Sequence, residues 1–432
     1  MAVDRPESLA WAMYDWANSA FMLTVITAVF PIYFLELARE LNPALAQQRF
    51  AETTRDSLIA IALLAPFLGA FADVRPVKKR LLGFFAGVGV VATACMFFLV
   101  PGDWQLALAL FAIANVGAAG SVVFYDALLP HVARPGEMDR LSTSGFALGY
   151  VGSGLLLILN LAWIQQPAWF GLPHAGGGEA LSVEEATLPT RLSFLAVALW
   201  WGVFTIPLLR RVPEPPGRGL EDGKSAVGAS LRSLLGTLRE LRRHRQACRM
   251  LFAFLVYNDG IATLIRMSAI YAASRDLDRS VIILSILVLQ FVGVPFSILF
   301  GHLGTRFGPK PVVLFGVCVY SVICMLAYNM TENWHFVVLA MLVGTVQGGT
   351  QGLSRSLFAS MIPEHKSGEF FALFAIGEKF AGVFGPLLFA LAIAQTGSAQ
   401  NAILTVIVFF VVGGALLTRV DVSAGRQEAR AG

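Results

Sequence analysis

Residues 69–78 read GAFADVRPVK, and residues 301–310 read GHLGTRFGPK. Both stretches carry glycine at the first position and lysine at the tenth, and they lie 232 residues apart. Four further pairs keep an offset of 232 or 233 residues: Pro130 and Pro363, Gly136 and Gly368, Gly149 and Gly382, Gly152 and Gly385. A near-constant offset at five places indicates an internal duplication. Two parallel repeats are typical of secondary transporters, whose substrate sites lie between the halves near the bilayer midplane.

The composition excludes a soluble enzyme of several domains and a disordered chain. Only 60 of the 432 residues are charged, whereas a soluble protein of this length would carry roughly 108. The 33 Phe and 41 Gly residues suit membrane helices that face lipid and pack closely. The net charge is +4, with no basic tract interleaved with aromatic residues, so we expect no nucleic-acid partner. The four cysteines show no CxxC spacing, which favours neither disulfides nor a metal site.

Apolar runs predict twelve transmembrane helices, since about 20 apolar residues cross the hydrocarbon core. No cleavable signal peptide is evident before the first run. The predicted spans are 9–35, 57–73, 81–100, 104–129, 141–165, 191–210, 247–272, 280–300, 311–329, 334–358, 369–394 and 401–418. The fold class is therefore an all-α integral membrane protein of two pseudo-symmetric six-helix bundles.

The distribution of Lys and Arg predicts the orientation. With the N-terminus inside, the inner segments hold 23 basic residues and the outer segments hold 6. Because cytoplasmic loops carry the excess of Lys and Arg, we expect both termini in the cytoplasm.

The segment 211–246 divides the chain into an N-terminal bundle (1–210) and a C-terminal bundle (247–432). It opens with the turn-rich run 213–217, and leucines then recur at helical spacing among arginines from Leu231 to Leu241. This pattern is typical of an amphipathic helix that rests on the inner leaflet. We interpret the linker as a tether between the halves.

The loop after the second span resembles the signature loop of the major facilitator superfamily, Gly-x-x-x-Asp-x-x-x-x-Lys-Lys/Arg. Glycine allows close helix approach, and the acid can face helix N-termini. The resemblance implies that this loop keeps the inner gate shut in the outward-facing state, through Gly69, Asp73, Lys78 and Lys79. The second copy, with Gly301, Arg306 and Lys310, has Thr305 in place of the acid. Anchoring of the inner loop by its basic residues is the simpler alternative.

Three stretches carry a narrower resemblance: YDWANSAF at 14–21, YNDG at 257–260 and GGTQGLSRSLF at 348–358. Together they resemble the autophagy-related vacuolar effluxer family of the major facilitator superfamily. The resemblance implies the twelve-helix transporter fold, and its eukaryotic members are linked to amino-acid export from vacuoles. The short termini and loops look bacterial, which implies the bacterial inner membrane.

Apart from the charges at the span ends, seven charged residues fall inside the predicted spans, where they are costly and mark transport pathways or paired charges. They are Asp15, Asp126, Asp259, Arg266, Arg355, Glu378 and Lys379. Asp259, beside Asn258, is a candidate for substrate or proton binding, and a pair with Arg266 on the same helix is the alternative. Asp15 shares a helix side with Asn18 and Ser19, which suits either a pathway or an interfacial cap.

The remaining intramembrane residues have two interpretations each. Glu378 is a candidate proton carrier, and Lys379 could pair with Asp259 or Asp15. For each of the two residues, a structural ion pair is the alternative to a role in transport. Arg355 and Asp126, near inner helix ends, favour gate ion pairs or snorkelling over substrate contact. Two glutamines deeper in the tenth span are candidate substrate hydrogen-bonders, Gln347 and Gln351.

We therefore expect a secondary transporter that moves a small solute by alternating access, with proton coupling and amino-acid efflux as finer hypotheses. Export of lipid-like or drug-like compounds is an alternative, and a non-transporting sensor or scaffold is another. Enzymatic activity is not expected, because the chain has no HExxH, GxSxG or GxxxxGK[ST] motif. We expect no cofactor or metal, and a monomer in the lipid bilayer.

Overall fold

The computed structural model describes residues 3–174, 181–217, 243–273, 277–380 and 384–431, and these residues form helices and short connections. The long helices of the first half are α1 (Pro6–Ala20), continued by a π-helix (Phe21–Val29) and α2 (Phe30–Leu37), then α3 (Pro43–Val74), α4 (Lys78–Cys95), α5 (Trp104–Val132), α6 (Met138–Gln165) and α7 (Val183–Arg211). The second half has α9 (Arg245–Ala273), α10 (Arg279–Phe307), α11 (Pro309–Tyr328), α12 (Asn333–Ala359), α13 (Ser367–Phe380), α14 (Phe384–Thr396), α15 (Ala399–Thr405), α16 (Ile407–Thr418) and α17 (Val422–Ala431). Short 3-10 turns lie at Met96–Phe98, Pro167–Phe170 and Glu364–Lys366.

Eleven helices of the described residues are long and apolar enough to cross a membrane. The predicted span 369–394 falls on α13 and the shorter apolar helix α14, between which residues 381–383 lie outside the described part. The count of twelve spans therefore stays a prediction. The amphipathic helix expected at 231–241 also lies outside the described residues.

Several helices are longer than the predicted spans. Helix α3 begins at Pro43, although the apolar run begins near residue 57. The first turns of α3 carry Arg49 and Glu52, which form an ion pair of 3.2 Å on the exposed surface. Because polar residues form helices outside the hydrocarbon core, hydropathy marks the membrane portion and not the end of the helix.

The first span changes its helix type in the middle. Pro31 lacks the N–H for an α-helical bond, and its ring conflicts with the carbonyl four residues earlier. The preceding residues, Phe21–Val29, form a π-helix, and the Thr27 hydroxyl donates to the Met22 carbonyl five residues back at 2.9 Å. The proline thus accounts for the irregular helical turn directly before α2 begins at Phe30.

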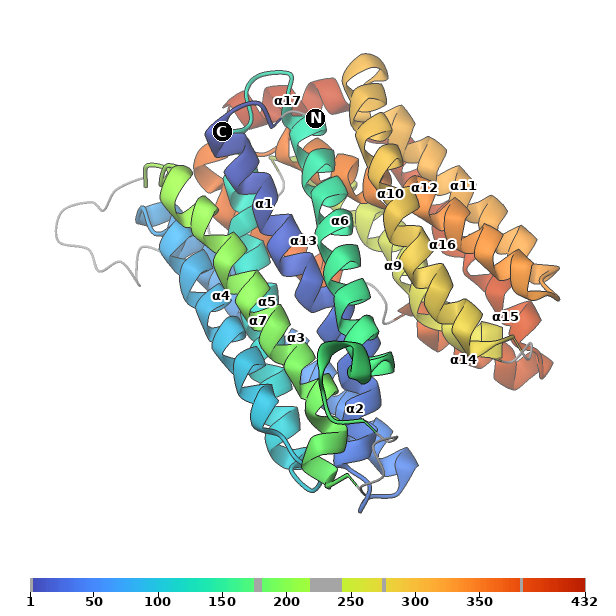
Figure 1. The fold of residues 1–432 in the computed structure, drawn as a ribbon. Coiled ribbons are helices and arrows are strands. Elements are labelled where there is room, and N and C mark those ends of the chain that lie inside the picture. The colour runs from blue at the N-terminus through green and yellow to red at the C-terminus, as the bar shows by residue number, and fades with distance from the viewer. Residues whose placement is uncertain (1–2, 175–180, 218–242, 274–276, 381–383, 432) are drawn as a thin grey trace.

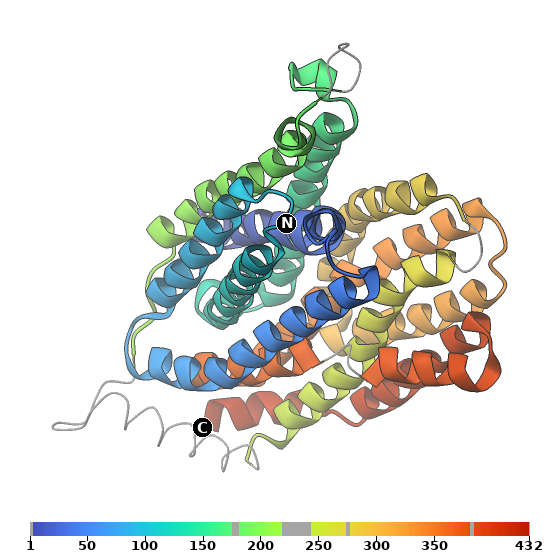
Figure 2. The ribbon, with the colours of Figure 1, turned by 90° about the horizontal axis from the view of Figure 1, so that it is seen from below.

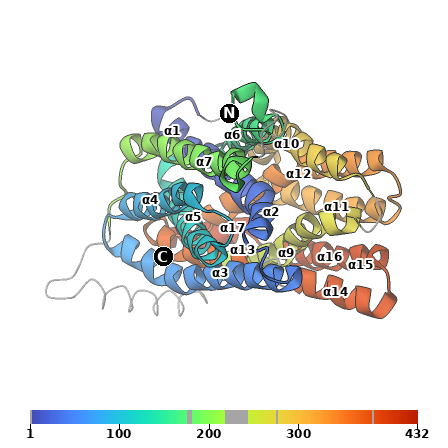
Figure 3. The ribbon, with the colours of Figure 1, turned by 60° about the horizontal axis from the view of Figure 1, so that its bottom comes forward.

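The helices form two groups that lie side by side (Figure 1). We call the group α1–α7 the N-half and the group α9–α17 the C-half; the domain boundaries 1–210, 211–246 and 247–432 stay a prediction. Helix α6 packs on α10 and α12 of the C-half, and α13 packs on α3 and α5 of the N-half. Figures 2 and 3 show α13 beside α3. Both ends of the chain lie at the same end of the bundle (Figure 1), which we call the terminal end.

Candidate functional site

A buried arginine of the C-half contacts three helices of the N-half. The guanidinium of Arg355, on α12, donates from Nη1 to Asp126 Oδ1 at 2.9 Å and from Nη2 to Asp15 Oδ2 at 3.4 Å. Its Nε donates to the Ser142 hydroxyl and its Nη2 to the Ser142 carbonyl, both at 2.9 Å. Asp15, Asp126 and Ser142 come from α1, α5 and α6. Arg355 is only 5% exposed, so these bonds are largely shielded from water.

Aromatic rings enclose this guanidinium. Its central carbon lies 4.8 Å from the ring centre of Phe146, 5.0 Å from Trp11 and 5.3 Å from Tyr125. The Tyr125 hydroxyl donates to Asp15 Oδ2 at 2.8 Å. Cation–π contacts add to the ion pairs when the cation is desolvated. We call Asp15, Tyr125, Asp126, Ser142 and Arg355 the Arg355 network, which joins the two halves.

The network lies toward the terminal end. Arg355 is in the last two turns of α12, and Asp126 is in the last two turns of α5. Ser142 is near the start of α6. Closure of the halves at this level is therefore ionic.

The first loop copy forms a second connection at the same end. The Asp73 carboxylate accepts from the backbone N–H groups of Gly368 at 3.0 Å and Glu369 at 2.9 Å, at the start of α13. Lys78 Nζ lies 2.7 Å from Asp73 Oδ1, and both side chains are almost fully buried. A Cβ added to Gly69 would collide with the Gly368 carbonyl, so the close approach of α3 and α13 requires glycine. We call Asp73, Lys78, Gly368 and Glu369 the Asp73 cluster.

The second loop copy is arranged differently. Gly301 packs against Thr143 and Arg140 of α6, and a Cβ there would collide with the Thr143 hydroxyl. Lys310 Nζ donates to the carbonyls of Thr418 at 2.8 Å and Val420 at 2.7 Å, which lie in its own half. The exposed Arg306 places its guanidinium 5.3 Å from the neighbouring Phe307 ring. This copy therefore crosses between the halves by packing, and its lysine bonds within the C-half.

A polar cluster lies between the halves at mid-helix depth. It contains Tyr150 of α6 and Ser297 of α10, and Gln347 lies at the same level of α12, one residue before Gly348. Tyr150 and Ser297 both abut Gly348, where an added Cβ would lie 3.2 Å from the Tyr150 hydroxyl oxygen and would collide with Ser297 Oγ. The Tyr150 hydroxyl, Ser297 hydroxyl and Gln347 carbonyl oxygen are buried, and none bonds to another described residue. Uncharged donors and acceptors of this kind suit a polar solute.

Asp259 lies elsewhere in the C-half. It is 1% exposed, and its Oδ1 accepts from the backbone N–H of Gly385, in the first turn of α14, at 3.2 Å. Arg266, two turns along α9, interacts with it electrostatically. The hydrogen bond from Gly385 therefore places Asp259 at a helix start, where a carboxylate is favourable.

The other predicted residues fall at separate places. Asn18 and Asn258 are buried on α1 and α9, and Ser19 contacts α6 at Gly149. Gln351 is half-buried on α12. The Lys79 side chain is half-buried, and its backbone N–H bonds to Glu214. The side chains of Glu378 and Lys379 lie outside the described residues.

Sequence reasoning singled out Gln347, but it missed Tyr125 and Ser142 of the Arg355 network and Tyr150 and Ser297 of the polar cluster. Tyr125 precedes Asp126, and Ser142 lies near Arg140, but neither side chain carries a charge that stands out in an apolar run. Tyr150 is flanked by Gly149 and Gly152, and these glycines were a usable sign of close packing around it. In the described part of the chain, no three His, Cys, Asp or Glu side chains gather as metal ligands would.

Comparisons with known proteins agree on a family. A family model described as "Vacuole effluxer Atg22 like" matches residues 57–430. The MFS-type transporter YxiO of Bacillus subtilis is 37% identical over 410 residues, covering 94% of this chain and 93% of that protein. Autophagy-related protein 22-1 of Phaeosphaeria nodorum is 23% identical over 535 residues, covering 100% and 92%.

Solved structures show the same fold. The proton:xylose symporter XylE superposes with a TM-score of 0.71 at 13% identity, covering 96% of this chain and 95% of that one. The transporter FucP in the outward conformation gives 0.67 at 13% identity, covering 98% and 100%. Both belong to the major facilitator superfamily.

Proposed function

The chain belongs to the Atg22-like vacuole effluxer family and is an integral membrane transporter of the major facilitator type, and from this premise we propose that it exports a small polar solute by alternating access coupled to protons. The observation that carries the proposal is Arg355, a buried guanidinium of the C-half held by two carboxylates of the N-half.

Two ionic connections support a gate at the terminal end. Alternating access requires the halves to part at one face while they close at the other. The Arg355 network and the Asp73 cluster both bury charges in that contact. When the halves separate, these charges must be hydrated or neutralised, because a buried charge that loses its partner is costly. In the proposed cycle, this geometry is the state closed at the terminal end.

Asp15 is the acid that we propose to carry the proton. The Arg355 network has two carboxylates for one guanidinium, so one carboxylate can be protonated while the other still neutralises Arg355. The pair with Asp15 is longer than the pair with Asp126, 3.4 Å against 2.9 Å. The Asp15 side chain is also more exposed, 16% against 7%. Protonation of Asp15 would therefore weaken the contact between halves at the lowest cost. Asp259 and Glu378 stay as further candidate acids.

The polar cluster of Tyr150, Ser297 and Gln347 is the proposed solute site. Its buried oxygens lie between the halves at mid-helix depth, where both faces can reach them in turn. Amino acids are the substrate class that we propose, because they are small, polar and consistent with the effluxer family that the chain matches. We further propose a monomer in the bacterial inner membrane, with both termini in the cytoplasm.

Reconstituted vesicles test the transport proposal. Efflux of labelled amino acids from proteoliposomes should rise with a pH gradient, and Asp15→Asn should abolish that gradient dependence. Glu36→Gln is the matched control, because Glu36 lies on the same helical stretch Pro6–Leu37 as Asp15 but pairs with Arg39 on the exposed surface. If efflux of no amino acid depends on the pH gradient, both the proposed proton coupling and the proposed substrate class are wrong.

Variants of the solute site separate binding from gating. Tyr150→Phe and Gln347→Leu should weaken the thermal stabilisation that a transported amino acid gives, because at a fixed ligand concentration this stabilisation falls as Kd rises. Stabilisation by apolar compounds alone, unaffected by these variants, would favour export of lipid-like or drug-like molecules. Binding without any flux would favour a sensor.

A further inference from the structure

The two halves carry hollows at equivalent positions of the terminal end. In the N-half, a hollow of about 630 Å³ lies between the start of α4 and the end of α7. In the C-half, a hollow of about 550 Å³ lies between the start of α11 and the end of α16. Each hollow is lined by residues in or directly after one loop copy, 69–78 or 301–310. Residues at or after the end of the sixth helix of the same half complete the lining. The two hollows can therefore be compared at the loop by the 232-residue offset, and beyond the sixth helix by the number of residues after its end.

The N-half hollow is neutralised by the chain itself. Glu214 is the third residue after α7, and its carboxylate accepts from the backbone N–H of Lys79 at 3.0 and 3.2 Å. Lys79 is in the first turn of α4, where an anion is favourable. Glu214 also faces the cations Lys79 and Arg80 that line the hollow. A carboxylate of the chain thus occupies the anion position.

The C-half hollow lacks this internal anion in its equivalent place. Asp421 is the third residue after α16, but its Oδ1 accepts from the Ser423 hydroxyl at 2.6 Å and the Ala424 N–H at 3.0 Å, at the start of α17. The hydrogen bond from Ser423, with that from Ala424, lowers the pKa of Asp421. The residue equivalent to Lys79 is Pro311, which has no N–H to offer. The carboxylate therefore faces its own helix.

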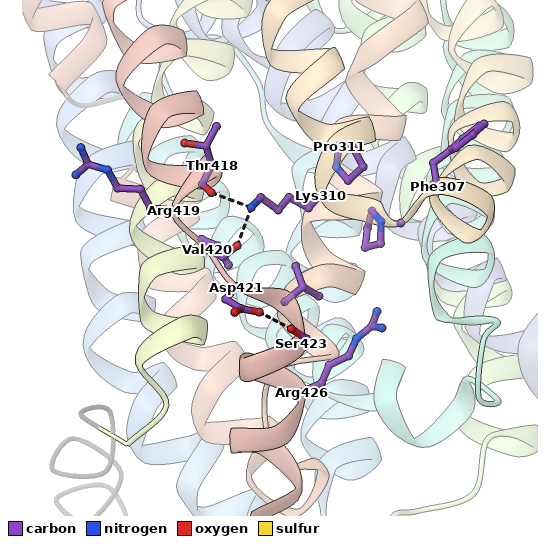
Figure 4. A pocket seen from close by; sticks show the side chains of 12 residues that line it. Phe307, Lys310, Pro311, Thr418, Arg419, Val420, Asp421, Ser423 and Arg426 are labelled. Atoms are coloured by element: carbon purple, nitrogen blue, oxygen red, sulfur yellow. Dashed lines mark hydrogen bonds between the residues drawn. The ribbon is translucent and has the colours of Figure 1, made fainter.

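Three cations line the C-half hollow: Lys310, Arg419 and Arg426. Lys310 reaches across it to the end of α16, and Arg426 extends toward the start of α11 (Figure 4). Arg419 and Arg426 are exposed. Asp139 of α6 interacts electrostatically with Arg426, and it accepts a hydrogen bond from the Ser356 hydroxyl. The cations thus outnumber Asp421, the one acid of the lining.

We propose that the C-half hollow binds the phosphate of an anionic phospholipid headgroup. Its lining includes Pro309, the first residue of the span Pro309–Tyr328, and Thr418, the last residue of the span Gln400–Thr418, which places the hollow at the level of the headgroups. Exposed Phe307 at its rim and exposed Phe315 further along α11 offer apolar surface to acyl chains. A free phosphate would gain nothing from these rings, so the lipid is favoured. The proposal is independent of the transported solute and of proton coupling.

Lipid binding to the purified, full-length protein tests the proposal. Native mass spectrometry and thermal unfolding would compare phosphatidylglycerol, phosphatidylcholine, and inorganic phosphate. We expect phosphatidylglycerol to bind and to raise the unfolding temperature, with little effect of the other two. The variant Arg419→Gln/Arg426→Gln should weaken phosphatidylglycerol binding about 30-fold, from about a factor of five for each basic side chain at a membrane surface.

The matched control is Arg210→Gln/Arg211→Gln, which removes two exposed arginines at the end of α7, the equivalent helix of the N-half. It should keep the wild-type affinity. Equal losses in both variants would overturn the site, since the effect would be general surface charge. Equal stabilisation by phosphatidylcholine, or by phosphate alone, would overturn the proposed headgroup.

Discussion

The two copies of the loop, at 69–78 and 301–310, began as the same sequence but make different contacts. In the first copy, Asp73 binds the start of α13 in the other half and is held by buried Lys78. In the second copy, Thr305 is exposed, and Lys310 bonds to the carbonyls after α16 in its own half. In both copies the lysine bonds within its own half, and only the carboxylate of the first copy reaches the other half. The terminal end is closed by charge on one side and by packing on the other.

The largest expected effect comes from removing the buried carboxylate of the first loop copy. Asp73→Ala leaves Lys78 buried without its carboxylate and leaves two N–H groups of α13 without an acceptor, which should cost about 3–5 kcal/mol. The matched control, Thr305→Ala in the second copy, should change stability by less than about 0.5 kcal/mol. Unfolding in a detergent titration measures both. An equal loss of unfolding free energy in the two variants would mean that the two loop copies stabilise the protein equally.

The next effect separates packing against a side chain from packing against backbone. Gly301→Ala places a methyl group on the Thr143 hydroxyl and should cost about 1–3 kcal/mol. Adding Thr143→Ala should restore most of this loss, which a double-mutant cycle detects. Gly69→Ala meets the Gly368 carbonyl of the backbone, so no side-chain trimming at that contact can restore it. If Thr143→Ala fails to rescue, the contact is misassigned.

A smaller effect tests the lysine of the second copy. Lys310→Met removes two hydrogen bonds to carbonyls at the end of α16 and should destabilise the protein by about 1–2 kcal/mol. Arg306→Met, four residues earlier and exposed, should have an effect below about 0.5 kcal/mol. Thermal unfolding of the two variants in the same detergent checks the difference. An equal shift would show that Lys310 acts as a surface charge alone.

The smallest effect tests whether the acid alone decides the arrangement. Thr305→Asp restores the sequence pattern, but position 305 is exposed while Asp73 is buried. The new carboxylate would remain in water, so we expect a change below about 0.5 kcal/mol. A gain of several times that value would show that the second copy can still form a buried ion pair.

The sequence predicted the fold class and the duplication because hydropathy and a constant offset are local or periodic properties. It also singled out Asp15, Asp126 and Arg355, since charges are rare in apolar runs. It could not bring them together, because Asp15 and Arg355 are 340 residues apart along the chain. Only the packing of α1, α5, α6 and α12 makes them neighbours.

The solute cluster was harder to predict for a different reason. Tyr150 and Ser297 are common residue types on apolar helices. The glycines beside Tyr150 indicate close packing, but no local sequence pattern separates either hydroxyl from one that is hydrogen-bonded in the core. Their significance lies in buried oxygens that have no hydrogen-bond partner among the described residues, which is a property of three-dimensional contacts. Asp259 illustrates the converse, since its conspicuous sequence position corresponds to a contact with the first turn of α14.

The π-helix at Phe21–Val29 has a consequence for experiments along the first span. Its wider turns change the number of residues per turn, so the helix face that holds Asp15 and Asn18 does not continue at α-helical spacing beyond Ala20. A cysteine-labelling scan should show a reactive position every three to four residues up to that point and then lose phase. Helical-wheel assignments of pore-facing residues in α2, made from α1, would select the wrong side chains.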